Sequence, residues 1–260
     1  KGFRGAGIRV AVFDTGLNAG GHDFSNVVEQ INWTNENSLM DTVGHGTHIA
    51  GVIAGRDPGC PGLAPDASLY VFRVFSNDQV SYTSWFLDAF NYALFLGVDV
   101  INLSIGGPDF MDQPFVDKVQ ELSAHGVVIV SAVGNDGPAF GTQHNPADQA
   151  DVIGVGAFSG RRGVGVSGVA SFQSRGMTTW ELPGGYGRVK PDLLAVGQHV
   201  LGPTAGEVAG KCSGLSGTSV ASPVVAGAIA LLASTMSEER RREVLNPASI
   251  KQVFVLYLLH

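Results

Sequence analysis

The sequence lacks an apolar run long enough to cross a bilayer as a helix, which takes about 20 residues. The best apolar candidate, Val224–Ala233, is too short and suits a buried helix instead. The chain begins at Lys1 and shows no signal peptide. We therefore expect a processed or partial chain that makes no membrane contact itself and whose targeting segments lie outside these residues.

Basic residues are scarce as well, and the formal net charge is −7. A protein that binds nucleic acid normally carries a basic patch. The densest basic run, Arg240–Arg242, lies in a Glu-rich stretch, which is typical of a solvated helix face. The charge pattern therefore indicates that nucleic acid is not a partner.

Only two cysteines occur, Cys60 and Cys212. They are far apart in the sequence and lack the CxxC spacing of metal sites. Spacing alone does not decide whether they form one disulfide or stay as two free thiols.

Apolar residues are abundant, at 44% of the 260 residues, whereas charged residues make up 15%. Such a chain can bury a sizeable core. Short apolar runs predict buried strands at Ile8–Phe13, Leu69–Val74, Val98–Ser104, Gly126–Ala132 and Asp151–Gly156. Helical patterns fall at Gly46–Ala54, Ser84–Leu96, Gln113–His125 and Gly217–Ser234, and Phe158–Arg188 reads as surface loops. This alternation predicts an α/β fold, with a mostly parallel central sheet and helices on both faces.

Two polar motifs near the start of the chain can carry chemistry. Asp14 ends the first predicted strand, where an acid can orient a histidine, although a turn or cap aspartate has the same pattern. His45 lies between two glycines in the segment Gly44–His48, which leave its imidazole room to face a cleft. His45 and His48 also have a spacing that suits metal ligands, but no third ligand has an obvious spacing. We expect His48 to pack behind the site.

Two further motifs follow later in the chain. Ser219 lies where a turn of small residues enters the longest predicted helix, near backbone N–H groups that stabilise negative charge. The alternative is that Ser219 is only a helix cap. Pro223 is expected in the first helical turn. Asn135 follows the strand that ends at Ala132, and its amide is a candidate oxyanion donor or an ordinary turn residue.

The order Asp, His, Ser, with an Asn before the Ser, is the order of subtilisin-type peptidases. From about Gly5 to Lys251 the chain resembles the subtilase family in these motifs. The resemblance implies a subtilisin-like three-layer fold and a serine endopeptidase that needs no cofactor for its chemistry. It also implies the catalytic triad Asp14, His45 and Ser219, with Asn135 as the oxyanion donor. Subtilases often contain a structural calcium ion, but its ligands, if present here, are unknown.

Stretches outside these motifs resemble a subgroup of subtilases that process membrane-bound proteins. They are Val80–Ala93, Leu103–Pro108, Phe115–Lys118, Ser174–Lys190 and Asn246–Ser249. The resemblance implies that residues 1–260 form one peptidase catalytic domain, with an inhibitory prosegment, a C-terminal lumenal region and a membrane anchor outside it. Its substrates would be proteins such as membrane-tethered transcription factor precursors, in the lumen of the endoplasmic reticulum and Golgi.

The subgroup resemblance also implies a substrate with arginine four residues before the cleaved bond and an aliphatic residue two before it. Asp78, Asp109 and Asp112 are candidate acids for that arginine. Leu103–Gly107 resembles the family's substrate-lining strand edge, so an extended peptide can add to it as a strand, unless it is an ordinary strand end. The predicted substrate-binding residues are Val80, Ser81, Tyr82, Ser104, Ile105 and Gly106.

Two sequons bear on location. Asn32 begins an N-glycosylation sequon, consistent with the secretory pathway, whereas the sequon at Asn102 falls on a predicted buried strand, where modification is not expected. Two other functions stay open: a subtilase of broad specificity, and a catalytically silent subtilase fold that acts as a binding protein.

Overall fold

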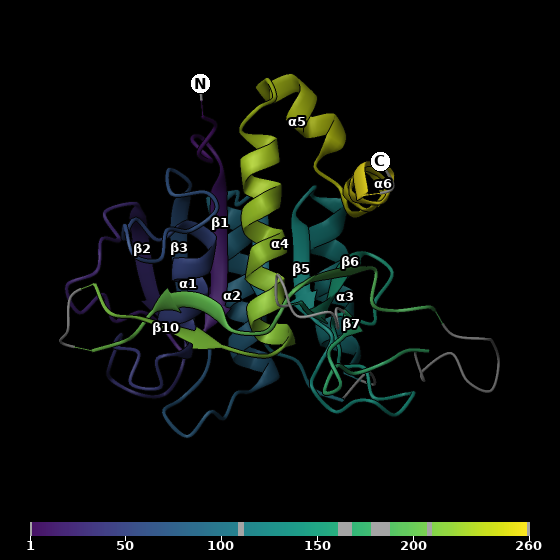
Figure 1. The fold of residues 1–260 in the computed structure, drawn as a ribbon, viewed down its shortest axis with the longest axis horizontal. Coiled ribbons are helices and arrows are strands. Elements are labelled where there is room, and N and C mark those ends of the chain that lie inside the picture. The colour runs from purple at the N-terminus through teal and green to yellow at the C-terminus, as the bar shows by residue number, and fades with distance from the viewer. Residues whose placement is uncertain (1, 109–111, 161–167, 178–187, 207–209, 259–260) are drawn as a thin grey trace.

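The computed structural model describes residues 2–108, 112–160, 168–177, 188–206 and 210–258, and places a sheet between two layers of helices (Figure 1). The strands are β1 (Arg9–Asp14), β2 (Val27–Asn32), β3 (Ser68–Arg73), β4 (Val100–Leu103), β5 (Val128–Ala132), β6 (Val152–Ser159), β7 (Gly168–Val169), β8 (Leu193–Val196), β9 (Val200–Pro203) and β10 (Cys212–Leu215). The helices are α1 (His45–Ala54), α2 (Thr83–Leu96), α3 (Gln113–Ala124), α4 (Thr218–Ala233), α5 (Glu238–Val244) and α6 (Pro247–Leu258).

The main sheet has the strand order β2-β3-β1-β4-β5-β6-β7, and β8 also pairs with β6. Among the strand pairs of this sheet that the structure describes, only β6 and β7 run antiparallel. The carboxyl ends of the parallel strands therefore meet at one edge. The chain turns to one side of β1 for β2 and β3 and to the other side for β4 to β6, and such a reversal leaves a crevice for a ligand at that edge.

Strand β1 shows why the strands read as continuous apolar runs. Its side chains alternate between faces, and both faces are covered. Val10 and Val12 enter the core shared with α1 and α4, and Ala11 and Phe13 enter the core shared with α2 and α3. Burying each large apolar side chain contributes about 1.5–3 kcal/mol, so the sandwiching layers hold β1 at the centre.

The five predicted strands and four predicted helices are all present, and their ends differ from the predicted ones by three residues at most. Helix α5 is exposed and carries ion pairs of Arg240 with Glu243 and of Arg242 with Glu238, which confirms the predicted solvated face. Strands β2, β7, β8, β9 and β10 and helix α6 were not predicted, and the prediction of surface loops over Phe158–Arg188 is wrong in part, because Ala170, Gln173 and Ser174 are buried. Within Phe158–Arg188 the structure describes the end of β6 and the short β7, while residues 161–167 and 178–187 lie outside the described residues.

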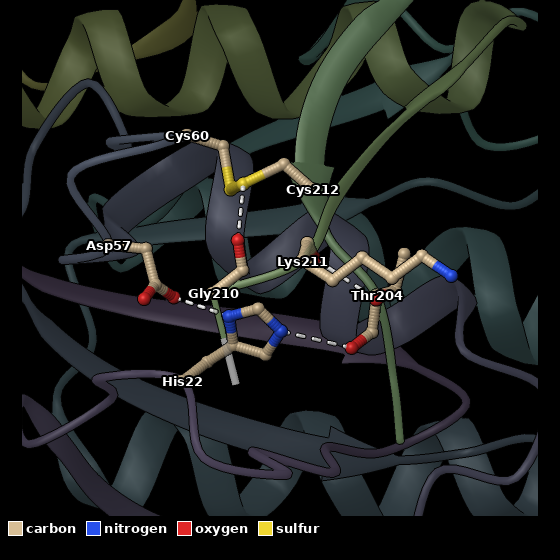
Figure 2. The surroundings of a disulfide bond; sticks show 7 residues. All are labelled: His22, Asp57, Cys60, Thr204, Gly210, Lys211 and Cys212. Atoms are coloured by element: carbon tan, nitrogen blue, oxygen red, sulfur yellow. Dashed lines mark hydrogen bonds and ion pairs between the residues drawn. A yellow bond between two sulfur atoms is a disulfide. The ribbon is translucent and has the colours of Figure 1, made fainter. Parts of the chain in front are cut away.

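A disulfide between Cys60 and Cys212 ties the segment after α1 to β10, which decides the question that spacing left open (Figure 2). Beside it, His22 Nδ1 lies 2.5 Å from a carboxylate oxygen of Asp57, and His22 Nε2 lies 3.1 Å from the carbonyl of Thr204. The hairpin of β9 and β10 is thus held to two loops of the main domain. In the part of the chain that the structure describes, the helices are too short or too polar to span a bilayer.

Candidate active site

The predicted acid and base lie in contact. Asp14 ends β1 and is fully buried, whereas the side chain of His45, the first residue of α1, is 26% exposed. His45 Nδ1 lies 2.7 Å from Asp14 Oδ1, which also accepts the backbone N–H of Thr15 at 2.8 Å. Because a carboxylate can only accept, Nδ1 carries the proton and Nε2 of the neutral ring is left as a base.

The pKa of His45 reflects opposing influences. Burial by itself lowers it, but the charge of Asp14, the hydrogen bond to Asp14 and the charge of Asp41 together raise it above the ordinary histidine value. The two carboxylates therefore outweigh the effect of burial and favour the charged imidazole.

The glycine after His45 is required by close packing. A Cβ at Gly46 would lie 2.3 Å from the carbonyl oxygen of Gly16, in the loop that follows β1. Only glycine lets the start of α1 approach that loop so closely. This approach brings the imidazole of His45 to the carboxylate of Asp14.

His48 lies behind the site, as predicted. It is 1% exposed, and a Cβ on Gly202 of β9 would meet its ring at 2.8 Å. Burial, followed by the charge of His45, lowers the pKa of His48 to about 4, so the ring is neutral near pH 7. Across the described ranges, no cluster of three or more His, Cys, Asp or Glu side chains is placed to hold a metal ion.

Helix α4 places Ser219 at its second residue. The helix begins at Thr218, and Gly217 is its N-cap, so the interpretation of Ser219 as a cap is wrong. Pro223 lies inside α4 rather than in its first turn, because the helix starts earlier than the proline position suggested. A proline there has no N–H to donate to the carbonyl four residues earlier, which is that of Ser219.

Asn135 lies beside Ser219 and is oriented by the same helix. Its side-chain oxygen accepts hydrogen bonds from the backbone N–H of Thr218 at 2.9 Å and from the hydroxyl of Thr218 at 3.1 Å. The amide nitrogen is thereby turned to the other side. A Cβ at Gly217 would lie 3.0 Å from Ser219 Oγ and 3.5 Å from Asn135 Nδ2, so both groups border the same space.

That space belongs to a cavity of about 290 Å³ at the carboxyl edge of the sheet. Ser104, Asn135 and Ser219 line it, together with His144, whose Nε2 lies 2.5 Å from a carboxylate oxygen of Asp136. The structure thus brings together predicted site residues from the segments that follow β4 and β5 and from α4.

A second cavity, of about 280 Å³, lies next to the first. Ser81, Tyr82, Ile105 and Gly106 line it, and Ile105 and Gly106 border both cavities. Of the predicted substrate-binding residues, all of which the structure describes, only Val80 lines neither cavity.

The three candidate acids are placed differently. Asp112 lines the second cavity and caps α3, because its carboxylate accepts the backbone N–H of Phe115 and also the hydroxyl of Thr83. Asp78 is exposed and lines neither cavity. Asp109 lies outside the described residues.

The two sequons also differ in exposure. Asn32 ends β2 and is half-buried, with its side-chain oxygen accepting the backbone N–H of Thr34 at 2.9 Å and its nitrogen donating to the carbonyl of Glu36. Asn102 is fully buried and is hydrogen-bonded to Ser104 and Ser222, which supports the expectation that its sequon is not modified.

One buried acid at the site was not predicted. Asp41 lies four residues before His45 and accepts hydrogen bonds at the start of α1. Acids favour helix N-termini, so its position in the sequence was an available signal.

Comparison with known proteins agrees with this geometry. The family model described as the subtilase family matches residues 5–256, so the chain belongs to the subtilase family of serine proteases. This confirms the predicted family, the α/β fold with a mostly parallel sheet and the class of enzyme. The chemistry of this family needs no cofactor.

Within the family, the chain is similar to a particular kind of protease. It is 61% identical over 254 residues to the membrane-bound transcription factor site-1 protease of Rattus norvegicus, covering 98% of this chain and 23% of that protein. It is 57% identical over 255 residues to subtilisin-like protease SBT6.1 of Arabidopsis thaliana, covering 98% of this chain and 24% of that protein. The chain thus spans about a quarter of the length of these curated relatives.

A solved structure, Sphericase, superimposes with a TM-score of 0.76 at 29% sequence identity, covering 92% of this chain and 82% of that one. The subgroup resemblance that the sequence suggested is therefore confirmed as a likeness to site-1 protease, and the fold as subtilisin-like.

Proposed function

We propose that residues 1–260 form the catalytic domain of a serine endopeptidase that cleaves membrane-bound precursor proteins at specific sites. The observation that carries this proposal is the pairing of His45 with Asp14 at the same edge of the sheet as the cavity shared by Ser219 and Asn135. An acid, a base, a nucleophile and an oxyanion donor at one site are the parts that acyl transfer requires.

In the proposed reaction, Ser219 Oγ attacks the scissile carbonyl carbon and gives its proton to His45 Nε2. Asp14 holds the tautomer and stabilises the imidazolium that forms. The backbone N–H of Ser219 and the amide of Asn135 donate to the oxyanion. His45 then protonates the leaving amine, and a water molecule, deprotonated by the same ring, hydrolyses the acyl-enzyme.

The substrate is proposed to lie as an added strand along Ser104, Ile105 and Gly106, facing the segment 80–82. The backbone of Gly107 supports ending the added strand at Gly106. Its N–H donates to the carbonyl of Asn145 at 3.2 Å, and its carbonyl accepts the N–H of Asn145 at 2.8 Å. A strand added to this edge therefore has to use the residues before Gly107.

Within this proposal, Asp112 receives the side chain of an arginine four residues before the cleaved bond. Asp112 is supported by its place in the second cavity, where aromatic side chains and the backbone of Gly106 also form the walls. Its carboxylate already caps α3, so it is held in one orientation. Guanidinium groups pair well with such fixed carboxylates.

The likeness to a membrane-bound protease supports cleavage of membrane-tethered transcription factor precursors, and the sequon at Asn32 agrees with the secretory-pathway lumen. The inhibitory prosegment, the lumenal region and the membrane anchor belong to the same proposal for the full-length protein. The proposal includes no nucleic-acid partner.

A fluorophosphonate serine-hydrolase probe tests the chemistry. We expect the purified chain to be labelled and labelling to vanish in Ser219→Ala and in His45→Ala. A folded wild-type chain that takes up no label would contradict the proposal and favour a catalytically silent binding protein.

A peptide panel then tests specificity, comparing arginine with glutamine four residues before the cleaved bond. We expect Asp112→Asn to lower kcat/KM for the arginine peptides by roughly 10- to 100-fold and to leave the glutamine peptides unchanged. Asparagine also caps helices well, so folding should survive, and Asp78→Asn is the matched control. Equal cleavage of both peptides by the wild-type chain would instead favour a subtilase of broad specificity.

A further inference from the structure

Asp41 is a fully buried carboxylate at the start of α1. Its Oδ1 accepts the hydroxyl of Thr15 at 2.8 Å and the backbone N–H of Gly44 at 2.7 Å. Its Oδ2 accepts the backbone N–H of Thr47 at 2.8 Å and the hydroxyl of Thr47 at 2.6 Å. Every one of these partners is a donor, and together with the helix N-terminus they offset the cost of burying the charge.

These bonds connect the two segments that carry the acid and the base. Thr15 follows Asp14 directly, and its backbone N–H donates to the same Asp14 oxygen that faces His45. The hydroxyl of Thr15 donates to Asp41 and accepts the backbone N–H of Gly46 at 2.9 Å. Asp41 therefore lies at the centre of a network that holds the end of β1 against the first turn of α1.

The charges around His45 also support a role for Asp41. The ionisable groups that act on His45 or are acted on by it are Asp14 from β1, Asp41 from the loop before α1 and His48 from α1. His48 is neutral near pH 7, because its pKa is lowered to about 4. The two carboxylates are therefore the charges that favour the protonated imidazole, and only Asp14 touches it.

We propose that Asp41 is a positioning residue for catalysis, which holds His45 in register with Asp14 and adds a second negative charge on this side of the site. This inference rests on the proposed triad. It differs from a purely structural role, in which Asp41 would stabilise the fold without changing the turnover of correctly folded molecules.

The variant Asp41→Asn tests this proposal with almost no change in shape. Asparagine has an NH₂ group in place of one of the two carboxylate oxygens. This group donates only, so it would face either the N–H of Gly44 or the N–H of Thr47 without forming a hydrogen bond. We expect kcat per titrated active site to fall roughly 10- to 100-fold, as for a small misplacement of a catalytic group, with KM nearly unchanged. We also expect the acid limb of the pH profile of kcat/KM to move to lower pH.

The variant Thr47→Val is the matched control, because it removes one hydroxyl bond to Asp41 and keeps the charge. We expect a smaller loss of kcat and no shift of the acid limb. Fluorophosphonate titration counts the active sites in each preparation, so misfolded molecules do not enter the rates.

An Asp41→Asn chain with wild-type kcat per active site and an unmoved acid limb would overturn the proposal. If that variant does not fold, Thr15→Val tests the proposal instead. It removes the hydroxyl that joins Asp41 to the backbone of Gly46 and keeps both Asp14 and Asp41. Unchanged kcat in Thr15→Val would then overturn the proposal. Failure of the triad itself is distinguished by a wild-type chain that takes up no probe.

Discussion

The two helices that begin at the candidate site differ in what meets their N-termini. At α1 the buried carboxylate of Asp41 accepts the backbone N–H groups of Gly44 and Thr47, so a full negative charge lies there. At α4 the backbone N–H of Thr218 meets only the neutral amide oxygen of Asn135. Helix N-termini carry a partial positive charge, which α1 neutralises inside the protein and α4 keeps for a negative charge that arrives with the substrate.

This difference separates the candidate site into an acid and base half at α1 and a nucleophile half at α4. The acid and base half is organised by fixed charges before any substrate binds, because both Asp14 and Asp41 are buried and hydrogen-bonded. In the proposed mechanism the nucleophile half is neutral and is completed only by the developing oxyanion. Substitutions in the first half should therefore change pH dependence, and those in the second half should change turnover at every pH.

The largest effect is expected from the nucleophile. Ser219→Ala should lower kcat by roughly a million-fold, and the double variant with His45→Ala should lose little more, because the triad acts as a unit. Steady-state hydrolysis of a fluorogenic peptide measures this. Additive losses in the double variant would mean that the two residues act independently.

Asn135→Ala should lower kcat by about 10²–10³-fold at all pH values, with KM almost unchanged, because one oxyanion donor is lost. Asn91→Ala, on the exposed surface of α2, is the matched control and should keep wild-type kcat. A kcat for Asn135→Ala within a few-fold of wild type would remove Asn135 from the proposed oxyanion site.

The disulfide couples the two regions mechanically, because Cys60 follows α1 and Cys212 lies on the strand that leads to α4. It closes a loop with a sequence separation of 152, so replacing both cysteines with serine should lower the free energy of unfolding by about 2–4 kcal/mol. Urea unfolding of the double variant measures the loss. An unchanged unfolding midpoint would show that the covalent link adds no stability.

The two cap glycines offer a direct comparison of the helix starts. A Cβ at Gly217 would enter the space beside Ser219 Oγ, so Gly217→Ala should lower kcat by tens of fold or more. A Cβ at Gly44 would meet only Ala205 Cβ, at 3.4 Å. Gly44 has a φ of 88°, so Gly44→Ala should cost roughly 1–2 kcal/mol of stability and little turnover. The same kinetic loss in both variants would mean that backbone strain, not the oxyanion space, is responsible.

The smallest expected effect is the change of activity with pH in the wild-type chain. His45 must be neutral to accept the serine proton, and the charges of Asp14 and Asp41 raise its pKa. Activity should therefore fall as the pH drops through a value above the ordinary histidine pKa of about 6.5. A profile of kcat/KM between pH 4 and 9 measures this, and an acid limb below 6.5 would argue that burial outweighs the carboxylates.

Much of the fold follows from local patterns. The buried strands were predictable because both of their faces are covered, which leaves uninterrupted apolar runs such as Val10–Phe13. β2 was not predictable in this way, because it lies at the edge of the sheet and carries Glu29 and Gln30. The hairpin of β9 and β10 also lacks a hydrophobic pattern, because most residues of its two strands are partly or fully exposed and several have small side chains.

The candidate site was predictable where a residue type has a strong local context, as for Asp14, His45 and Ser219. For Asp41 the sequence offered only its position near the start of a helix, because its role depends on donors from Thr15 and Thr47 that meet only in the folded chain. The choice of Asp112 over Asp78 likewise depends on which loop borders the second cavity.

The sequence by itself determined the alternation of strands and helices, the family and the order of its motifs, because hydrophobic periodicity and short-range chemistry are written in neighbouring residues. Only the tertiary structure decided the pairing of Cys60 with Cys212 and the network that joins Asp41 to Thr15. Those features depend on contacts between residues far apart in the chain, and local pattern carries no information about which distant segments the parallel sheet brings to one edge.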